Sequence, residues 1–355
     1  MLKHWSTMLS PGEEVHAYLR EPIPPESIAH LNLSSAIKFE IVPPKMQGIV
    51  WENFPMALRA RKTADVLFGP AYTLPLLSRK PRKRVVATHS VNQVESGAHD
   101  FWYNYTYAKR DELCARSADA VIVPCDTAAD LVAKQYGVPR KRLFSVPQGA
   151  PHSFRPLENP ELLRQTRIAF LGTDAPYILF VGKLSSRRNI PNLIGGFAKA
   201  KKAKGLPHKL LLVGPNHVHL PLAEVCREHG VTADVVQTDG KFTDHEELIP
   251  LYNAADVFIQ PSIFEGWSIT TVEALACGTA VIASNRGGLI DVAHGHAYML
   301  EDPSVETIAD ALEKVLLDDY LRQELKQLAR ARGKTFTWER TTGETLDVIR
   351  QVARS

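Results

Sequence analysis

The alternation of apolar runs with a capped helix between residues 256 and 291 constrains the fold more than any other stretch of the chain. Residues 256–260 form a short apolar run that is typical of a buried strand. Ser268 stands where a helix N-cap belongs, and Gly278 would end that helix about three turns later. A second apolar run, residues 279–284, follows at once. This order predicts a parallel βαβ unit, whose loops at the strand carboxyl ends are where open α/β sheets bind ligands.

Two glutamates flank the start of the predicted helix. Glu265 lies in the loop before it, and Glu273 lies inside it. Between them, the amides of Trp267, Ser268 and Ile269 are free donors at the positive end of the helix dipole, which suits a phosphate or a diphosphate. The alternative is that both are ordinary solvated helix glutamates, which is the commoner case for two glutamates at this spacing alone.

The same stretch resembles the signature of the retaining glycosyltransferases of family 4, which have the GT-B fold. That signature reads Pro-Ser, two residues, Glu-Gly-aromatic, a second Glu opening Glu-Ala-Leu-Ala, and then Gly-x-x-Val-Ile, and residues 261–282 match it. The resemblance implies that Glu265 contacts the donor sugar and that Glu273 binds the ribose hydroxyls of the sugar nucleotide. It also places Gly266 beside the donor, and it shows one departure, Ser268, where the family more often has Gly.

A pair of cations follows the first predicted strand of the second half. The family has Gly-Arg, four residues and then Lys at this position, whereas here Lys183 follows Gly182 and Arg188 takes the later place. The resemblance implies that both cations grip the donor diphosphate, although an ammonium and a guanidinium are not equivalent contacts. The alternative is two solvated cations ahead of a helix. Gly240 lies in a loop that runs beside the nucleotide base in the family.

His89 ends a predicted strand and therefore lies at the ligand edge of its sheet. A lone histidine is more often a satisfied structural residue than a catalytic one. Family members carry a histidine after the matching strand, commonly as His-Asp, near the donor sugar, and here Ser90 replaces that Asp. The resemblance therefore implies that His89 and Glu265 orient the sugar.

The chain of 355 residues is long enough for two α/β domains. Apolar runs alternate with helical segments, which indicates parallel sheets covered by helices on both faces. We expect strands at 14–19, 37–42, 65–68, 84–88, 120–123, 143–146, 177–181, 209–213 and 235–237, and helices at 50–61, 101–117, 127–135, 190–202, 246–253, 304–332 and 338–352.

The resemblance implies an α/β protein of the GT-B fold, with two doubly wound Rossmann-like domains facing a cleft. We expect an acceptor-side domain over residues 1–155, a nucleotide-sugar-binding domain over 156–335, and a final helix over 336–355 that crosses back to the first domain. The family opens on a strand and a Gly-rich loop, whereas this chain opens on a short helix. We therefore expect that first strand and loop to be missing.

Composition excludes several classes of protein. Apolar content of 45% and charge of 23% are ordinary for a globular chain, and the four cysteines show no paired spacing, which fits reduced thiols in a cytoplasmic protein. No apolar run approaches the length of a membrane span. The basic run from Arg79 to Arg84 is either a solvated loop or a peripheral contact with the inner face of a membrane, and no nucleic-acid motif accompanies it.

The expected reaction is the transfer of a sugar from a nucleotide-diphosphate sugar to an acceptor hydroxyl, with retention, in polysaccharide or glycolipid assembly. No Asp-x-Asp occurs, so we expect neither a metal nor a cofactor, and Lys183 and Arg188 to neutralise the diphosphate. Residues 65–75 resemble those of bacterial mannosyltransferases, which favours GDP-mannose and leaves a UDP-sugar open. The acceptor would be a carbohydrate or lipid-linked. The alternative is a non-catalytic or truncated relative that binds nucleotide sugar without turnover.

Overall fold

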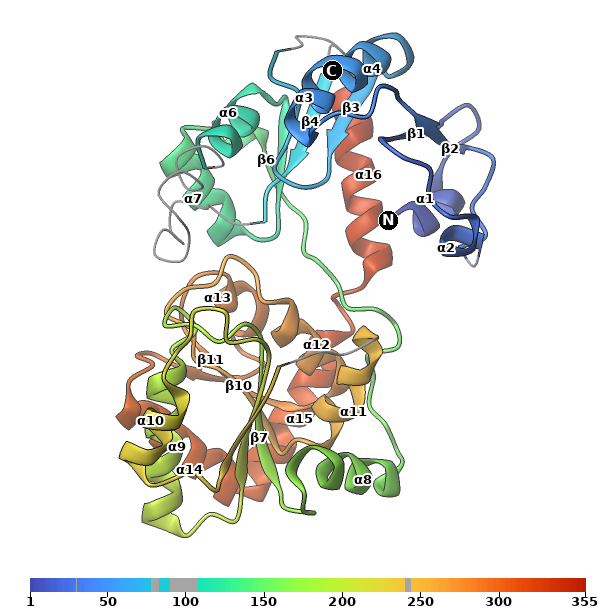
Figure 1. Cartoon of the computed structure of the whole chain (residues 1–355). Helices are drawn as coiled ribbons and strands as arrows, with labels where there is room; N and C mark the ends of the chain where they lie inside the picture. Colours follow the sequence, from blue (N-terminus) through green and yellow to red (C-terminus); the bar gives the residue numbers. More distant parts are fainter. Residues whose placement is uncertain (30, 78–82, 90–107, 240–243) are drawn as a thin grey trace. The chain divides into compact units, whose positions relative to one another are not determined.

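The computed structural model describes residues 1–29, 31–77, 83–89, 108–239 and 244–355 (Figure 1). The chain divides into two units: Met1–Gln148 together with Trp338–Ser355, and Gly149–Thr337. Each unit has its own parallel sheet and its own hydrophobic core.

The first unit holds six strands and the final helix of the chain among its described residues. Its elements are α1 (Leu2–Met8), β1 (Val15–Leu19), α2 (Pro25–Ala29), β2 (Ile37–Ile41), α3 (Gly48–Trp51), η1 (Glu52–Met56), α4 (Ala57–Thr63), β3 (Val66–Gly69), β4 (Lys83–Ala87), α6 (Lys109–Ser117), β5 (Ala120–Val123), α7 (Asp126–Tyr136), η4 (Arg140–Arg142), β6 (Leu143–Ser145) and α16 (Trp338–Arg354). Strands β3, β4, β5 and β6 form one parallel sheet in chain order, and β1 pairs in parallel with β2.

The final helix α16 completes the core of the first unit. Val348 and Val352 pack with Val85 of β4 and Ile122 of β5 in one buried cluster. At its start, Thr341 donates its hydroxyl to the carbonyl of Pro147 at 2.7 Å. The last 18 residues therefore belong structurally with the first 148.

One expected helix of the first unit differs from the prediction, and another is only partly described. The helix expected at 50–61 is divided into α3, the π-helical turn η1 and α4, because Pro55 lies inside it and has no amide proton to continue the ladder. Of the helix expected at 101–117, only α6 (Lys109–Ser117) falls within the described residues; its aromatic beginning lies outside them.

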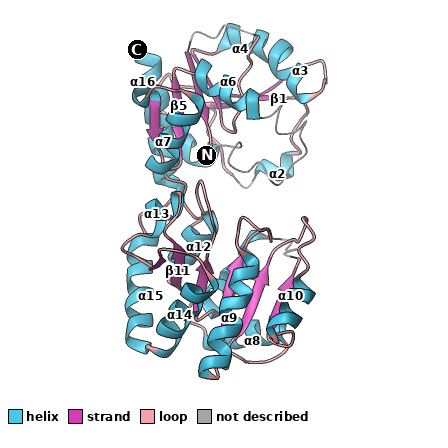
Figure 2. Ribbon diagram, turned by 90° about the vertical axis from the view of Figure 1, so that its left-hand side faces the viewer, coloured by secondary structure: helices cyan, strands magenta, loops and turns pink. Residues whose placement is uncertain are grey.

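The second unit is a six-stranded parallel sheet covered by helices on both faces (Figure 2). Its elements are α8 (Pro160–Leu171), β7 (Tyr177–Val181), α9 (Ile190–Lys204), β8 (Lys209–Val213), α10 (Leu222–His229), β9 (Val235–Thr238), η5 (His245–Glu247), α11 (Leu248–Ala254), β10 (Val257–Gln260), α12 (Ile269–Cys277), β11 (Ala280–Ser284), α13 (Gly288–Ala293), β12 (Tyr298–Leu300), α14 (Val305–Leu317) and α15 (Asp319–Gly333).

The strand order is β12-β11-β10-β7-β8-β9, so the chain leaves β7 in one direction and returns through β10 in the other. The point between β7 and β10 is the topological switch point, where a doubly wound sheet opens a crevice at its carboxyl edge. The predicted βαβ unit is confirmed as β10, α12 and β11. Ser268 caps α12 by accepting the amide of Thr271 at 3.4 Å, and Gly278 ends it at φ 72°.

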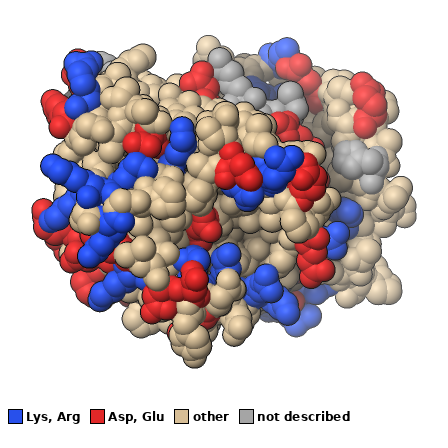
Figure 3. Space-filling model, turned by 90° about the horizontal axis from the view of Figure 1, so that it is seen from below, with Lys and Arg blue, Asp and Glu red and all other residues tan. Residues whose placement is uncertain are grey.

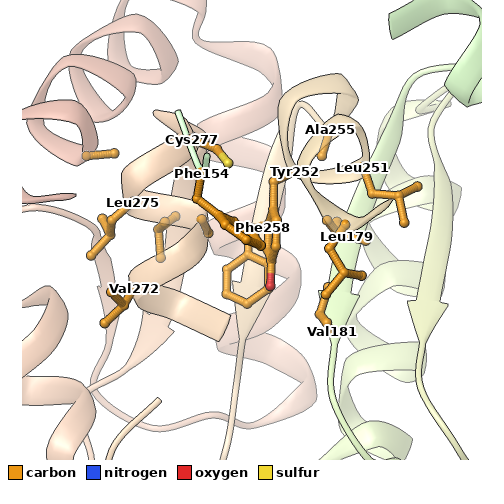
Figure 4. Packing of buried hydrophobic residues seen from close by; sticks show 14 of the residues in the cluster. Phe154, Leu179, Val181, Leu251, Tyr252, Ala255, Phe258, Val272, Leu275 and Cys277 are labelled. Carbon is orange, nitrogen blue, oxygen red and sulfur yellow. The ribbon is translucent and has the colours of Figure 1, made fainter. Parts of the chain in front are cut away.

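Alternate residues of the buried strands point to opposite faces of this sheet, because side chains alternate along a strand. Leu179 and Val181 join the cluster under α11, α12 and α13, whereas Ile178 and Phe180 join the cluster under α9 and α14. At the centre of the first cluster, the ring of Tyr252 packs against those of Phe154 and Phe258, with centroids 6.1 and 5.7 Å away (Figure 4). This packing fixes α11 against α12, and both helices carry site residues.

Candidate functional site

The loops after β7 and after β10 meet at the switch point of the second unit. The amide of Ile263 in the second loop donates to the carbonyl of Arg187 in the first, at 2.9 Å. The side chain of Arg187 also contacts the second loop: its Nη1 donates to the carbonyl of Phe264 at 2.6 Å. The two loops are thus joined by their backbones before any ligand is considered.

Glu265 is buried at this junction, with 4% of its surface exposed. Its Oε1 accepts hydrogen bonds from Ser262 Oγ at 2.9 Å and from Gln260 Nε2 at 3.1 Å. On the other side, Arg187 Nη1 lies 3.0 Å from Oε2, and Arg188 Nε lies 3.7 Å from Oε1. The solvated alternative is therefore wrong for Glu265, whose desolvation is offset by two guanidinium groups and two neutral donors.

Arg187 was missed by the sequence analysis, which took Arg188 from its register in the family motif. The available signal was the Arg187-Arg188 pair itself, in a loop directly after a buried strand. Neither the sequence register nor the helix start shows which of two neighbouring arginines turns toward Glu265. In the structure both do, and Arg187 makes the shorter contact.

Glu273 lies in α12 with 1% of its surface exposed, so the solvated alternative is wrong here too. Tyr252 of α11 donates its hydroxyl to Oε2 at 2.8 Å. His245 of η5 lies with Nε2 2.6 Å from Oε1, and this hydrogen bond raises the pKa of the imidazole above its usual value. Burial, together with the charge of Glu273, raises the pKa of Tyr252. The sequence analysis named neither partner.

Gly182 is required where it stands. Its φ is +146°, and a Cβ added there would lie 2.9 Å from Cζ of Arg188, closer than a side chain tolerates. The guanidinium of Arg188 therefore lies directly over Gly182. Lys183, the other cation of the predicted pair, is exposed and forms no ion pair with another residue of the described part of the chain.

The start of α12 presents backbone amides at the same place. The first bond of the helix runs from the amide of Val272 to the carbonyl of Ser268 at 3.1 Å, so the amides of Trp267, Ser268 and Ile269 precede it. The indole of Trp267 packs edge-on against Phe336, with ring centroids 5.5 Å apart. The side chain of Trp267 thus packs against the core, and the binding of a ligand by its backbone amide stays a prediction.

The peptide after Glu265 is also held close to a second loop. The amide of Gly288, the first residue of α13, donates to the carbonyl of Glu265 at 2.7 Å. Gly287 has φ 54°, and a Cβ on it would meet the same carbonyl. This contact holds the peptide that links Glu265 to Gly266, in addition to the contacts of Arg187.

His89 lies in the first unit, at the end of β4. Gln148 Nε2 lies 2.6 Å from its Nδ1, and its ring meets that of Tyr72 edge-on at 5.4 Å. Burial lowers the pKa of the imidazole, against a hydrogen bond to the carbonyl of Pro70. His89 lines a cavity of about 450 Å³ within this unit, together with Phe68, Ile122 and Gln148. Gly240, the remaining predicted site residue, lies outside the described residues.

The basic run of the first unit is only partly described. Arg79, Lys80 and Arg82 lie outside the described residues. Arg84 is 7% exposed, and its Nη1 lies 3.4 Å from Ser117 Oγ, so its place in a solvated or membrane-facing cluster was predicted wrongly. On the face drawn in Figure 3, basic and acidic side chains are interspersed rather than gathered by sign.

The described residues contain neither a membrane-spanning helix nor a cluster of metal ligands. None of the helices they form is long and apolar enough to cross a membrane. Among the same residues, no three His, Cys, Asp or Glu side chains are grouped as they would be around a metal ion.

Many curated proteins resemble this chain, among them the following two. O-antigen chain mannosyltransferase B of Escherichia coli is 26% identical over 238 residues, which cover 66% of this chain and 61% of that protein. D-inositol 3-phosphate glycosyltransferase of Rhodococcus erythropolis is 30% identical over 270 residues, which cover 73% of this chain and 58% of that protein. The chain thus spans about three fifths of the length of each relative.

Solved structures resemble almost the whole chain. Sucrose-phosphate synthase from Thermosynechococcus elongatus matches with a TM-score of 0.74 at 20% identity, over 100% of this chain and 92% of that one. HepE of Anabaena, solved in complex with UDP-glucose, matches with a TM-score of 0.69 at 16% identity, over 96% and 90%.

Two α/β units with parallel sheets, together with these neighbours, define the GT-B fold class of glycosyltransferases, as predicted. Likeness at such low identity shows the fold alone. The sequence model described as "Glycosyl transferases group 1" matches residues 164–332, which include the whole junction of Arg187, Glu265 and Glu273. Over this segment the chain is similar to the group 1 glycosyltransferases.

Proposed function

We propose that the chain is a retaining glycosyltransferase that moves a sugar from a nucleotide-diphosphate sugar to an acceptor hydroxyl. The observation that carries the proposal is the junction at the switch point, where buried Glu265 lies between two arginines and the start of α12. This junction combines donors for an anion with a fixed carboxylate for sugar hydroxyls. The names of the two curated relatives, a mannosyltransferase and a glycosyltransferase, support the same reaction class.

The donor would bind in a defined order of groups along α12. Its diphosphate would meet the amides of Ser268 and Ile269, which lie at the positive end of the helix dipole. Arg188 and exposed Lys183 would supply positive charge from the loop after β7. Glu273, one turn farther along the helix, would accept hydrogen bonds from the ribose hydroxyls. Glu265 would accept hydrogen bonds from hydroxyls of the sugar.

Rate acceleration would come from the same cations. Negative charge grows on the leaving diphosphate as the glycosidic bond breaks, so donors aimed at it stabilise the transition state more than the ground state. The carbonyl of Glu265 is bonded to Gly288 and that of Phe264 to Arg187, so the loop cannot shift away as charge develops. His89, in the first unit, is proposed to orient the sugar as its counterpart does in the family.

The relatives suggest which donors and acceptors to test. Mannosyltransferases of O-antigen assembly are among the relatives, and a structural neighbour was solved with UDP-glucose, so GDP-mannose and UDP-glucose are the first donors to compare. We propose a polysaccharide or glycolipid acceptor, and a site of action at the cytoplasmic face of a membrane. Arg79, Lys80 and Arg82 would supply the membrane contact.

A single assay separates the proposal from its alternative. Purified protein is mixed with GDP-mannose, UDP-glucose and an ADP-sugar, and binding by calorimetry is followed beside release of the nucleoside diphosphate. We expect one donor to bind and turn over, and Glu265→Gln to reduce turnover by about 100-fold, the order of magnitude for loss of one interaction that orients the reacting group. Glu301→Gln, an exposed carboxylate of the same unit paired with Asn285, is the control and retains turnover.

The possible outcomes point in different directions. Donor binding without turnover in the unmodified protein, over a range of acceptors, would favour a nucleotide-sugar-binding relative that lacks catalysis. No stabilisation by any sugar nucleotide would contradict the donor site itself, since a ligand at 100 times its dissociation constant raises the unfolding free energy by about 2.7 kcal/mol.

A further inference from the structure

The environment of Glu273 contains one contact that the proposed function does not require. A carboxylate that is to receive ribose hydroxyls needs free acceptor positions on its oxygens. In the structure both oxygens already have donors, Tyr252 on Oε2 at 2.8 Å and His245 on Oε1 at 2.6 Å. Because the carboxylate is 1% exposed, a ligand cannot approach without meeting one of these donors.

The two donors differ in their access to solvent. Tyr252 is fully buried and belongs to the aromatic stack of the core. The side chain of His245 keeps 55% of its surface exposed, while the carboxylate it contacts keeps 1%. His245 is therefore the donor on the solvent side, and a hydroxyl entering from solvent competes with its Nε2 for Oε1.

His245 is held in this place by its local structure. Asp244 caps the short helix η5 by accepting the amide of Glu246 at 3.0 Å, and the amide of Asp244 donates to Glu247 at 3.0 Å. The imidazole lies against the ring of Phe154, with centroids 5.3 Å apart and an angle of 38°. Apart from these contacts the side chain of His245 is open to solvent, with 55% of its surface exposed.

Charged and titratable groups face His245 from several described elements. Glu273 of α12 and Asp244 beside it favour the protonated ring, whereas burial opposes protonation. Tyr252 of α11 faces the same carboxylate, and the charge of Arg188 reaches Tyr252 from the loop after β7. Residues 240–243, directly before η5, lie outside the described residues.

We propose that His245 is a positioning residue for Glu273: the protonated ring holds the carboxylate in the unliganded protein, and a sugar nucleotide displaces it from Oε1 with release of its proton. This inference rests on the proposed function, because it assumes that the ribose binds at Glu273. The displaced ring loses the partner that favours its protonated form, and the proton passes to the solvent.

The proposal predicts that affinity for a sugar nucleotide rises with pH. The free protein holds His245 protonated to a higher pH than the liganded protein, because only the free protein keeps the bond to Glu273. Between the two pKa values, binding releases up to one proton, and affinity therefore rises with pH by at most about tenfold per unit. Below and above that window, affinity no longer changes through this residue.

The test is calorimetric titration of the unmodified protein with GDP-mannose and with UDP-glucose between pH 5.5 and 8.5. These probes are diphosphate diesters, which do not titrate in that range, unlike free nucleoside diphosphates. Titration in two buffers of different ionisation enthalpy counts the protons released. We expect a fraction of one proton up to a whole one, and an affinity that rises several-fold across the window.

Two variants test whether His245 positions Glu273 or has only a structural role. His245→Gln keeps a donor near Glu273 but cannot release a proton, so its affinity is expected to be flat with pH and its proton release to vanish. His294→Gln removes an exposed histidine at the end of α13 in the same unit, and it should keep the slope of the unmodified protein. Binding that is equally pH-dependent in His245→Gln overturns the positioning role while leaving the donor site intact. Absence of binding at any pH overturns the proposed function, and this inference with it.

Discussion

Arg187 and Glu265 lie 3.0 Å apart from Nη1 to Oε2, and the same nitrogen donates to the carbonyl of Phe264 at 2.6 Å. One guanidinium thus holds both the carboxylate and the backbone of the loop that carries it. The carboxylate is nearly inaccessible, whereas the guanidinium is partly exposed. Arg187 therefore acts on Glu265 from the solvent side, while Ser262 and Gln260 act from within the protein.

Replacing Arg187 should destabilise the second unit. Arg187→Gln leaves Glu265 buried with one guanidinium fewer, and we expect the free energy of unfolding to fall by about 2 kcal/mol, because a buried charge that loses a partner keeps its desolvation cost. Urea denaturation followed by circular dichroism measures the change. Arg164→Gln, which breaks an exposed pair with Glu161 in the same unit, is the control and should leave the free energy of unfolding unchanged. Equal stability of the two variants would show that Arg187 does not compensate Glu265.

Adding a methyl group to Gly182 should displace Arg188. In Gly182→Ala the new Cβ meets the Arg188 guanidinium, so we expect affinity for a sugar nucleotide to fall by about tenfold, the value of one lost charge-assisted contact. Gly172→Ala is a matched control, because Gly172 also has positive φ, +72°, but open space around its Cβ position. Backbone strain is larger in Gly182→Ala, because φ +146° lies outside the left-handed helical region that Gly172 occupies, so circular dichroism must first show that both variants are folded. Calorimetry should then find weaker binding in Gly182→Ala alone.

Ser268 replaces the glycine that is commoner at this position in the family, and the structure shows it capping α12. Ser268→Ala should cost about 1 kcal/mol of stability through loss of the cap, whereas Ser268→Gly should cost only a few tenths. Ser304→Ala removes an equivalent cap, on Thr307 at the start of α14, as the control. Thermal unfolding should rank Ser268→Ala with Ser304→Ala. Only Ser268→Ala should also weaken sugar-nucleotide binding; the same loss in Ser304→Ala would point to a general effect of stability.

Glu13 should make the first unit sensitive to acid. Its pKa is lowered to about 2, chiefly by its hydrogen bonds to Arg350 of α16. A group whose pKa is lower in the folded protein stabilises it above the unfolded pKa, near 4.5, and loses that effect as the pH falls toward 2. After allowance for solvent screening, the loss should be about 1 kcal/mol.

Urea denaturation at pH 6 and at pH 3 tests this expectation. Glu13→Gln should narrow the difference in stability between the two pH values, because the variant has no carboxylate to protonate. Glu158→Gln, at an exposed position before α8, serves as the comparison and should leave that difference unchanged. The same narrowing in both variants would mean that Glu13 has no special part in acid sensitivity.

Much of the second unit follows from its sequence because local signals and burial agree there. Residues 177–181 are apolar throughout and form the central strand β7, which is buried on both faces. Ser268 and Gly278 are strong start and stop signals, and α12 begins and ends beside them. In the first unit, Pro55 was present in the sequence, but a proline inside a helical pattern does not itself predict whether the helix breaks, kinks or widens into a π turn.

The sequence predicts those site residues that belong to the strand-loop-helix motif itself, but not their partners from other elements. Glu265, Glu273 and the amides before Ile269 were found because the helix start and the family signature fix them. Their partners come from other elements: Tyr252 from α11, His245 from η5 and Arg187 from the loop after β7. No local pattern reports such pairings, since they depend on the strand order of the sheet. The expected placement of Lys183 and His89 at the donor stays a prediction.

The place of α16 in the first core has a consequence for how the protein is made. The ribosome synthesises residues 1–148 first, but Val348 and Val352, which pack on Val85 and Ile122, emerge only after the whole second unit. Residues 149–337 are contiguous and can fold before α16 emerges, as domains generally fold as units during synthesis. The first unit therefore completes its core after the second unit has been synthesised, and deletion of α16 would damage the fold of residues 1–148.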